Sequence, residues 1–374
     1  MVRINFNRLR FLVIDDNAHM RRIMRSLLHG FGTREVYEAE DGAAGLEAFT
    51  QYGPDIVITD WVMPIFDGLE LVQMIRQPGA NANPYVPIIM LTGHSEKHRV
   101  VRARDAGITE FLAKPISATA LYERILNLIA NPRPFVRTKT YFGPDRRRNV
   151  NANYIGPERR KGGKADVIRS LCSTRSLAEG QERKGMAVRK DNMPSVRTFA
   201  DHEVITQANP LHKAIAPASA DDDDPVARAE AALAQLSTEF AEWMQTECER
   251  LEMARQEVVR LGFTEKTHAE LFRAAHDIKG EAATFGYPAV VGAADSLCRL
   301  LEHTPDTSRI PLTLVEQHVD AVRAIAREYA RADLASVAGT LTRRLREVTD
   351  EFLRNENADR PDYLESIFAP TLAP

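Results

Sequence analysis

The sequence predicts two domains of different class: an α/β domain with a doubly wound, five-stranded parallel sheet, and an all-α four-helix bundle. A long disordered linker is expected between them. Three observations support this division. Up to residue 131, five short apolar runs alternate with amphipathic helical segments, as in repeated strand–helix units. Residues 132–225 show little periodicity, with scattered Pro, Gly and Ser. Residues 226–354 are rich in helix formers, and we assign residues 355–374 to a C-terminal tail.

The composition is that of an ordinary soluble protein and excludes little by itself. Hydrophobic residues make up 44% and charged residues 27% of the 374 residues, and the net charge of −3 indicates no particular partner. Three cysteines, Cys172, Cys248 and Cys298, show no CxxC or metal-ligand spacing. We find no signal peptide and no apolar run of about 20 residues. These features predict free thiols and a cytoplasmic location.

The α/β assignment depends on five predicted strands in the first 131 residues. Amphipathic segments follow the strands; the first of these ends near Gly30 and Gly32, and the last covers residues 117–130. Five strand–helix units in a row imply parallel strands with right-handed crossovers. The predicted strands cover residues 11–14, 35–39, 55–59, 87–91 and 110–113.

Polar side chains stand where four of these strands end. Asp15 and Asp16 follow the first strand, Asp60 the third, Thr92 the fourth and Lys114 the fifth. The carboxyl ends of parallel strands share one edge of a sheet, where open α/β sheets bind ligands. Three carboxylates at that edge repel one another unless a cation gathers them, and a hard ion such as Mg²⁺ suits oxygen ligands.

The same edge could hold a phosphoryl group on Asp60. Thr92 could donate a hydrogen bond to this group, and Lys114 could supply a positive charge, so that both would stabilise charge developing during transfer. Taken alone, Asp60 could merely cap the following helix. However, a purely structural explanation needs independent coincidences at all four strand ends, so we favour the chemical one.

These residues resemble the receiver domain of two-component response regulators, in particular the single-domain chemotaxis regulator. The resemblance covers about the first 130 residues. It rests on the acid pair, on Asp60 followed by Met63, Pro64 and Gly68, on Thr92, and on Lys114 with Pro115.

The resemblance implies a flavodoxin-like fold and a role for each of these residues. Asp60 would be the phosphoacceptor. Mg²⁺ would be bound by Asp16, Asp60 and the backbone carbonyl of Val62, with Asp15 acting largely through water. Thr92 and Lys114 would contact the phosphoryl group, and Phe111 matches the aromatic switch position.

Two further positions tune the lifetime of the phosphoryl group in this family, and Val62 and His94 occupy them here. The Val62 side chain cannot orient a hydrolytic water by hydrogen bonding. We therefore expect a long-lived phospho-Asp60. His94 is either a second tuning residue or a plain surface residue.

The middle region contains a duplicated motif of an apolar residue, Gly-Pro, an acid and three bases. The first copy covers residues 142–148 and the second residues 155–161. The charges are either simply solvated or form an anion-binding element for a nucleotide messenger such as a cyclic dinucleotide, RNA, DNA or a membrane surface. No helix-turn-helix surrounds the motif, which argues against sequence-specific DNA binding. The candidate anion-binding residues are Arg146, Arg147, Arg148, Arg159 and Arg160.

The C-terminal half predicts helices joined by short loops, the pattern of an antiparallel bundle. The predicted helices cover residues 228–260, then a segment from Thr264 or Thr267 to 284, residues 287–303, and one or two helices within 312–352. In the second helix, an apolar stripe at helical spacing predicts the core-facing side. The stripe consists of Leu271, Ala275, Ile278, Ala282 and Phe285.

His276 lies off this stripe, on the same face as Phe272, Lys279 and Gly280. A lone surface histidine on a helix is usually incidental. Here, however, Lys279 lies one turn away, and Gly280 costs helix stability but would give a partner clearance to approach His276.

The residues from His276 to Gly280, followed by Phe285 and Gly286, resemble the histidine phosphotransfer (HPt) domain. The resemblance implies that His276 accepts a phosphoryl group, that Lys279 supports it and that Gly280 permits docking. A histidine-kinase helix would need an ATP-binding domain downstream, and the sequence after His276 shows no such motifs.

We therefore expect a phosphorelay protein and not a kinase. Asp60 would take a phosphoryl group from an upstream kinase or other phosphohistidine donor. His276 would exchange it with Asp60 or with a separate downstream regulator. The alternative is a phosphorylation-switched adaptor or kinase-inhibiting module without relay, in which the arginine motif could bind an anionic messenger.

Overall fold

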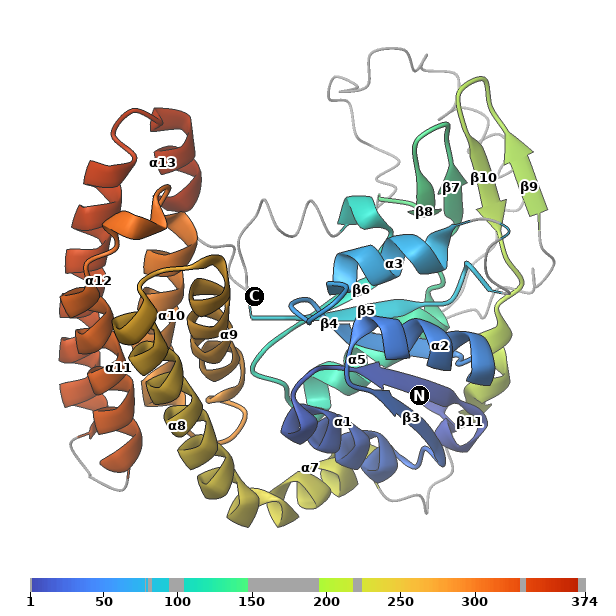
Figure 1. The fold of residues 1–374 in the computed structure, drawn as a ribbon. Helices are drawn as coiled ribbons and strands as arrows, with labels where there is room; N and C mark the ends of the chain where they lie inside the picture. The colour runs from blue at the N-terminus through green and yellow to red at the C-terminus, as the bar shows by residue number, and fades with distance from the viewer. Residues whose placement is uncertain are drawn as a thin grey trace, which may run out of the picture.

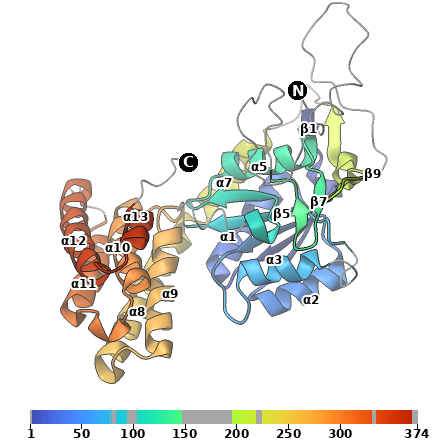
Figure 2. The same ribbon diagram turned by 90° about the horizontal axis from the view of Figure 1, so that it is seen from above.

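The computed structural model describes residues 2–77, 79, 83–93, 104–146, 195–217, 224–329 and 334–368. An α/β domain and a helical bundle lie side by side, and a small antiparallel sheet is attached to the α/β domain (Figure 1). In two views at right angles the bundle lies beside one end of the parallel sheet (Figures 1 and 2). Within the part of the chain described, no helix is long and apolar enough to cross a membrane.

The five predicted strands are confirmed, and they form one parallel sheet in the order β3-β2-β4-β5-β6. Every residue of β4 and β5 is buried, as expected for strands covered by helices on both faces. The strands are β2 (Arg10–Ile14), β3 (Glu35–Ala39), β4 (Ile56–Asp60), β5 (Ile88–Thr92) and β6 (Glu110–Ala113).

Helices cover both faces of this sheet, and polar side chains fix where they begin. The Asn17 side chain accepts hydrogen bonds from two backbone amides at the start of the first helix, and Asp67 and Glu70 form a capping box. Gly32 ends the first helix with a φ of 105°, a left-handed conformation that favours glycine. The helices are α1 (Ala18–Phe31), α2 (Gly42–Tyr52), α3 (Gly68–Arg76) and α5 (Ala118–Ala130).

The disordered linker predicted over residues 132–225 is wrong for the stretches of it that the structure describes. Four strands pair there as an antiparallel sheet in the order β8-β7-β10-β9. Strands of three or four residues are too short to show alternation in the sequence, and β7 pairs with β10, which lies far along the chain. The strands are β7 (Phe135–Arg137), β8 (Phe142–Pro144), β9 (Ser195–Thr198) and β10 (Glu203–Thr206).

Aromatic and arginine side chains attach this small sheet to the α/β domain. The rings of Tyr85, Phe135 and Phe142 lie with centroids 5.0–5.6 Å apart. The guanidinium of Arg76 lies 5.2 Å from the Phe135 ring and donates hydrogen bonds to the carbonyls of Gly107 and Pro84. The small sheet is thus packed onto the α/β domain.

The following segment is also fastened to the α/β domain. Strand β11 (Ile215–Pro217) pairs with β1 (Val2–Ile4), and the turn η2 (Pro210–Ala214) lies near η1 (Phe6–Arg8). The Asn209 side chain donates to the Ile129 carbonyl at 2.9 Å, and Lys213 Nζ lies 2.8 Å from Asp55 Oδ1. The chain therefore stays on the α/β domain as far as Pro217.

Four helices form the bundle, and each packs against the next in a closed ring: α8, α9, α10 and α11. The apolar stripe of the second predicted helix is buried, as expected. Its last member, Phe285, stacks on Trp243 with ring centroids 4.0 Å apart. The bundle helices are α8 (Ser237–Leu261), α9 (Glu265–Glu281), α10 (Pro288–His303) and α11 (Leu312–Arg327).

The helix boundaries correct several predictions. The single helix expected over residues 228–260 is two helices, α7 (Pro225–Gln235) and α8, separated by Leu236. Thr264 caps α9, which ends at Glu281 and not at residue 284. The tail expected from residue 355 is helical where described, because α12 (Leu334–Glu356) continues into it and α13 (Pro361–Phe368) follows. Cys248 and Cys298 are free thiols, and Cys172 lies outside the described residues.

Candidate functional site

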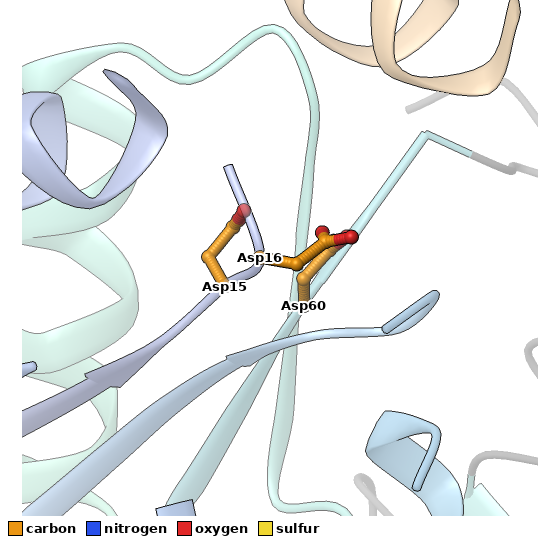
Figure 3. A group of neighbouring side chains, drawn as sticks. All are labelled: Asp15, Asp16 and Asp60. Atoms are coloured by element: carbon orange, nitrogen blue, oxygen red, sulfur yellow. The ribbon is translucent and has the colours of Figure 1, made fainter. Parts of the chain in front are cut away.

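Three aspartates meet at the carboxyl edge of the parallel sheet. Asp15 and Asp16 directly follow β2, and Asp60 is the last residue of the neighbouring strand β4. One carboxylate oxygen from each lies within 4.8 Å of the others, and Figure 3 shows the three side chains gathered at the strand ends. The parallel register therefore converts separate positions in the sequence into one acidic cluster.

Lys114 brings a buried positive charge to this cluster. It follows β6, and its Nζ lies 3.1 Å from Asp60 Oδ1 and 3.7 Å from Asp15 Oδ2. Burial alone would lower the pKa of Lys114, but the carboxylates of Asp60, Asp15 and Glu281 raise it well above its ordinary value. Lys114 is therefore held in its charged form. Its backbone amide donates to the carbonyl of Thr92, so Thr92 and Lys114 lie side by side.

Burial and neighbouring carboxylates raise the pKa values of Asp15 and Asp16. Burial, with the charges of Asp277 and Asp60, raises the pKa of Asp16 to about 6. Burial and the Asp60 carboxylate also raise the pKa of Asp15 well above its ordinary value, although Lys114 opposes this. One lysine cannot neutralise three acids. Converging carboxylate oxygens of this kind fit a hard divalent ion such as Mg²⁺.

Helix α9 of the bundle lies over this edge and brings His276 to it. His276 is buried, whereas its position off the core stripe predicts a surface residue; Gly93 of the α/β domain lies near its ring. Its Nδ1 lies 3.7 Å from Asp277 Oδ1. A Cβ at Gly93, the residue after Thr92, would lie 4.0 Å from His276 Nε2. The Nε2 atom therefore faces the α/β domain.

Glycines allow this close approach. A Cβ at Gly280 would lie 3.2 Å from Lys114 Cδ, and one at Gly93 would lie 3.4 Å from Gly280 Cα. A Cβ at Gly280 would therefore require Lys114 to shift by a few tenths of an ångström, and one at Gly93 would just contact the backbone of α9. The sequence predicts that Gly280 leaves room for a partner to approach His276. In the structure, the α/β domain of the same chain occupies this space.

Sequence reasoning misses the residues that join the two domains. Glu281 Oε2 accepts a 2.7 Å hydrogen bond from Asn17 Nδ2, and its Oε1 lies 3.5 Å from Lys114 Nζ. The Ile116 amide donates to Thr284 Oγ1 at 3.1 Å. The only sequence signal for Glu281 is its place directly after Gly280. Asn17 is recognisable from sequence only as a helix cap.

Charged side chains surround His276 on the bundle side. Arg250 Nη1 lies 2.6 Å from Asp277 Oδ2 and 3.3 Å from Glu247 Oε2. Burial opposes ionisation of Asp277, but His276 and Arg250 hold its pKa below the ordinary value. Burial and the charge of Asp277 raise the pKa of Glu247 to about 7.

The remaining predicted residues lie in different surroundings. Lys279 Nζ lies 2.8 Å from Asp295 Oδ1 of α10, so it is bound within the bundle. Val62 and Phe111 are half-buried at the margin of the sheet's core. Arg146 Nε lies 3.3 Å from Asp105 Oδ1, and its guanidinium lies 4.2 Å from the Tyr141 ring. Outside the described residues lie His94, Arg147, Arg148, Arg159 and Arg160, so the anion-binding element stays a prediction.

Comparison with known proteins agrees with both domains. Residues 11–126 match the family model of the response regulator receiver domain, and residues 235–330 match that of the Hpt domain. Over 117 residues the chain is 32% identical to chemotaxis protein CheY-3 of Vibrio cholerae, covering 31% of this chain and 88% of that protein. It is 31% identical over 117 residues to chemotaxis protein CheY of Pseudomonas aeruginosa, covering 31% and 93%. The chain therefore belongs to the response regulator receiver family, and its receiver domain is fused to an HPt domain.

Proposed function

We propose that this protein is a phosphorelay intermediate in which Asp60 and His276 of one chain exchange a phosphoryl group. The observation that carries the proposal is the position of α9, whose His276 Nε2 faces the strand ends that hold Asp60, Thr92 and Lys114. Burial of both Asp60 and His276 supports the proposal. An upstream phosphohistidine donor would charge one domain, and a downstream response regulator would discharge the other.

The orientation of the imidazole suits the reaction. Asp277 lies on the Nδ1 side of the ring, 3.7 Å away, and Nε2 faces the receiver, so Nε2 is the nitrogen placed to carry the phosphoryl group; the imidazole proton is then on Nδ1. In transfer to the receiver, an Asp60 oxygen attacks phosphorus and the Nε2–P bond breaks. Its electron pair returns to Nε2, so a neutral imidazole remains. Holding both groups in one site replaces a bimolecular encounter by a positioned reaction.

The surrounding groups stabilise the charge on the transferred phosphoryl oxygens. Lys114 supplies a fixed positive charge beside Asp60, and the Thr92 hydroxyl supplies a hydrogen bond. Asp15, Asp16, Asp60 and the carbonyl of Val62 would hold Mg²⁺, which offsets negative charge on those oxygens when bound. Since Val62 offers no side-chain hydrogen bond to water, phospho-Asp60 should persist, and Val62→Asn should shorten its lifetime.

The test is to charge the full-length protein with a labelled small-molecule phosphoryl donor and Mg²⁺. Alkali treatment at early times separates alkali-stable phosphohistidine from labile phosphoaspartate. We expect label on Asp60 first and then on His276. His276→Ala should leave the label on Asp60, and Asp60→Asn should take none by this route. His268→Ala, which changes another histidine of α9, is the matched control.

The outcomes separate the relay from the adaptor. A receiver that charges fully but never passes label to His276 contradicts internal exchange. If His276 also accepts no phosphoryl group from any phosphorylated receiver, the switched adaptor replaces the relay as the best account of this chain.

A further inference from the structure

Helix α7 belongs neither to the receiver sheet nor to the four-helix ring, and it packs against α1 of the receiver (Figure 1). A Cβ at Gly30 of α1 would lie 2.4 Å from the Cα of Ala229 and 2.9 Å from its backbone nitrogen. Ala229 is fully buried there. The two helix backbones meet so closely that only glycine fits at position 30.

A charged side chain reinforces the same contact. Arg228 Nε donates to the carbonyl of Gly30 at 3.1 Å, and Nη2 donates to that of Phe31 at 3.3 Å. The last carbonyls of a helix have no partner within the helix, and a cation is favourable at that end. Arg228 of α7 thus provides hydrogen-bond donors to the C-terminal carbonyls of α1.

The path along the chain is short on both sides of α7. Strand β11 ends at Pro217, where it pairs with Val2 of β1, and α7 begins at Pro225. Residues 218–224 reach at most roughly 29 Å when fully extended. On the other side, Leu236 alone separates α7 from α8 of the bundle. These short connections limit how far α7 can move from its own receiver.

The edge that α9 covers is closed to other proteins in this arrangement. Asp15 and Asp60 are at most 3% exposed, and the Lys114 side chain is 2% exposed and lies against Glu281 of α9. A second protein could reach Asp60 only after the bundle moves away. Whatever holds the bundle in place therefore also decides which phosphohistidine reaches Asp60.

We propose that the α1–α7 contact is a strap that pairs the receiver with the HPt domain of its own chain and excludes those of other chains. The partner at this surface is the chain's own bundle. The proposal rests on the proposed function for the identity of the exchanging residues, but the packing stands apart from it. Gly30→Ala should displace α7, because the new Cβ would overlap its backbone.

Exchange between chains tests this directly. One full-length chain carries Asp60→Asn, the other carries His276→Ala, and label is charged on Asp60 of the second. With the strap intact, passage to His276 of the first chain should be slow. Adding Gly30→Ala to both chains should speed it by about tenfold, because neither site is then held at high effective concentration by its own partner. Gly339→Ala, whose Cβ meets open space in helix α12, is the matched control.

Small-angle X-ray scattering of the unphosphorylated protein separates the strap from the relay. Gly30→Ala should increase the radius of gyration, Arg228→Ala should do so less, and Gly339→Ala should leave it unchanged. Equal scattering and equal exchange for Gly30→Ala and Gly339→Ala would overturn the strap. So would a dimeric mass for the wild type, since the bundle would then serve a second chain. Expansion by Gly30→Ala without any phosphoryl exchange would support the strap while the relay fails.

Discussion

Two contacts with the receiver differ in chemistry: one is made by the bundle and the other by α7, the helix that leads into it. At the active-site contact, formed by Asn17, Lys114 and Glu281, buried charges and hydrogen bonds join the domains. At the strap, Gly30 and Ala229 bring two helix backbones together. Buried charges gain little net stability because desolvation opposes their attraction, whereas close packing is consistently favourable. The strap therefore suits lasting attachment, and the active-site contact suits repeated opening.

The largest effect should come from removing the support behind the active-site contact. Trp243 is fully buried and stacks on Phe285, whose ring also lies 6.5 Å from that of His19 in the receiver. Trp243→Ala should lower the free energy of unfolding of the bundle by about 3–5 kcal/mol. Denaturant titration followed by circular dichroism measures this. Met253→Ala, at an exposed position of the same helix, should change it by less than about 0.5 kcal/mol.

A change of charge should open the active-site contact without touching the strap. Asn17→Asp keeps the cap of α1 but places a carboxylate against Glu281, so docking should weaken by about 1.5–3 kcal/mol. Exchange of the Ile116 amide, which donates to Thr284, reports this opening. Asn17→Ser keeps a capping side chain without the added charge and should have a smaller effect. Equal protection in wild type and Asn17→Asp would show that this contact does not hold the domains together.

Lowering the pH should destabilise the bundle through His318, which lies in neither the active-site contact nor the strap. His318 is buried, its Nδ1 lies 2.7 Å from the Leu314 carbonyl, and its Nε2 lies 2.9 Å from Ser296 Oγ. Burial lowers its pKa below the ordinary 6.5, against the opposing hydrogen bond to Leu314. The unfolded chain therefore binds the proton more readily. The contribution of His318 to the free energy of unfolding should be constant above about pH 6.5 and should fall below it by at most about 1.4 kcal/mol per pH unit.

Unfolding titrations between pH 8 and 5 measure this slope, with His318→Gln as the variant that should reduce it. Thr349 Oγ1 also lies 3.3 Å from His318 Nε2, and no charged side chain is among these described partners. An unchanged slope in His318→Gln would assign the acid sensitivity to other groups.

The smallest effect should come from trimming the strap. Arg228→Ala removes two hydrogen bonds to the end of α1 and should weaken the α1–α7 contact by about 0.3–1 kcal/mol. Amide exchange in α7 measures it. Arg228→Lys retains the charge without the forked geometry of the guanidinium, so its amide protection in α7 should lie between those of Arg228→Ala and the wild type. If Arg228→Ala weakened the α1–α7 contact by more than Asn17→Asp weakens the active-site contact, the strap and not the active-site contact would depend more on charged groups.

The parts predictable from sequence are those with local patterns. The five strands of the parallel sheet show as apolar runs, and Asp15, Asp60 and Lys114 are found because each directly follows or ends a strand. The sequence around His276 predicts an HPt domain because its histidine, lysine and glycine lie within five residues. In each case neighbours in the sequence carry the information.

The remaining parts depend on contacts between distant residues. Strands β7 and β10 pair across more than fifty positions, and neither is long enough to show a period. The break at Leu236 has no Gly or Pro to mark it, so helix propensity continues through it. The bond between Asn17 and Glu281 exists only because two domains dock in one orientation.

The position of the small antiparallel sheet has a consequence for how this protein can change in evolution. The chain leaves this sheet after β8 and re-enters it at β9, and both strands are edges of the same four-stranded sheet. The described chain therefore leaves the receiver at one edge of this sheet and returns to it at the other edge. Insertions or deletions between β8 and β9 would leave the connection from the receiver to the bundle unchanged, because that connection begins only after β11. New recognition sequences could be acquired between these two strands without altering how α7 and the bundle are attached.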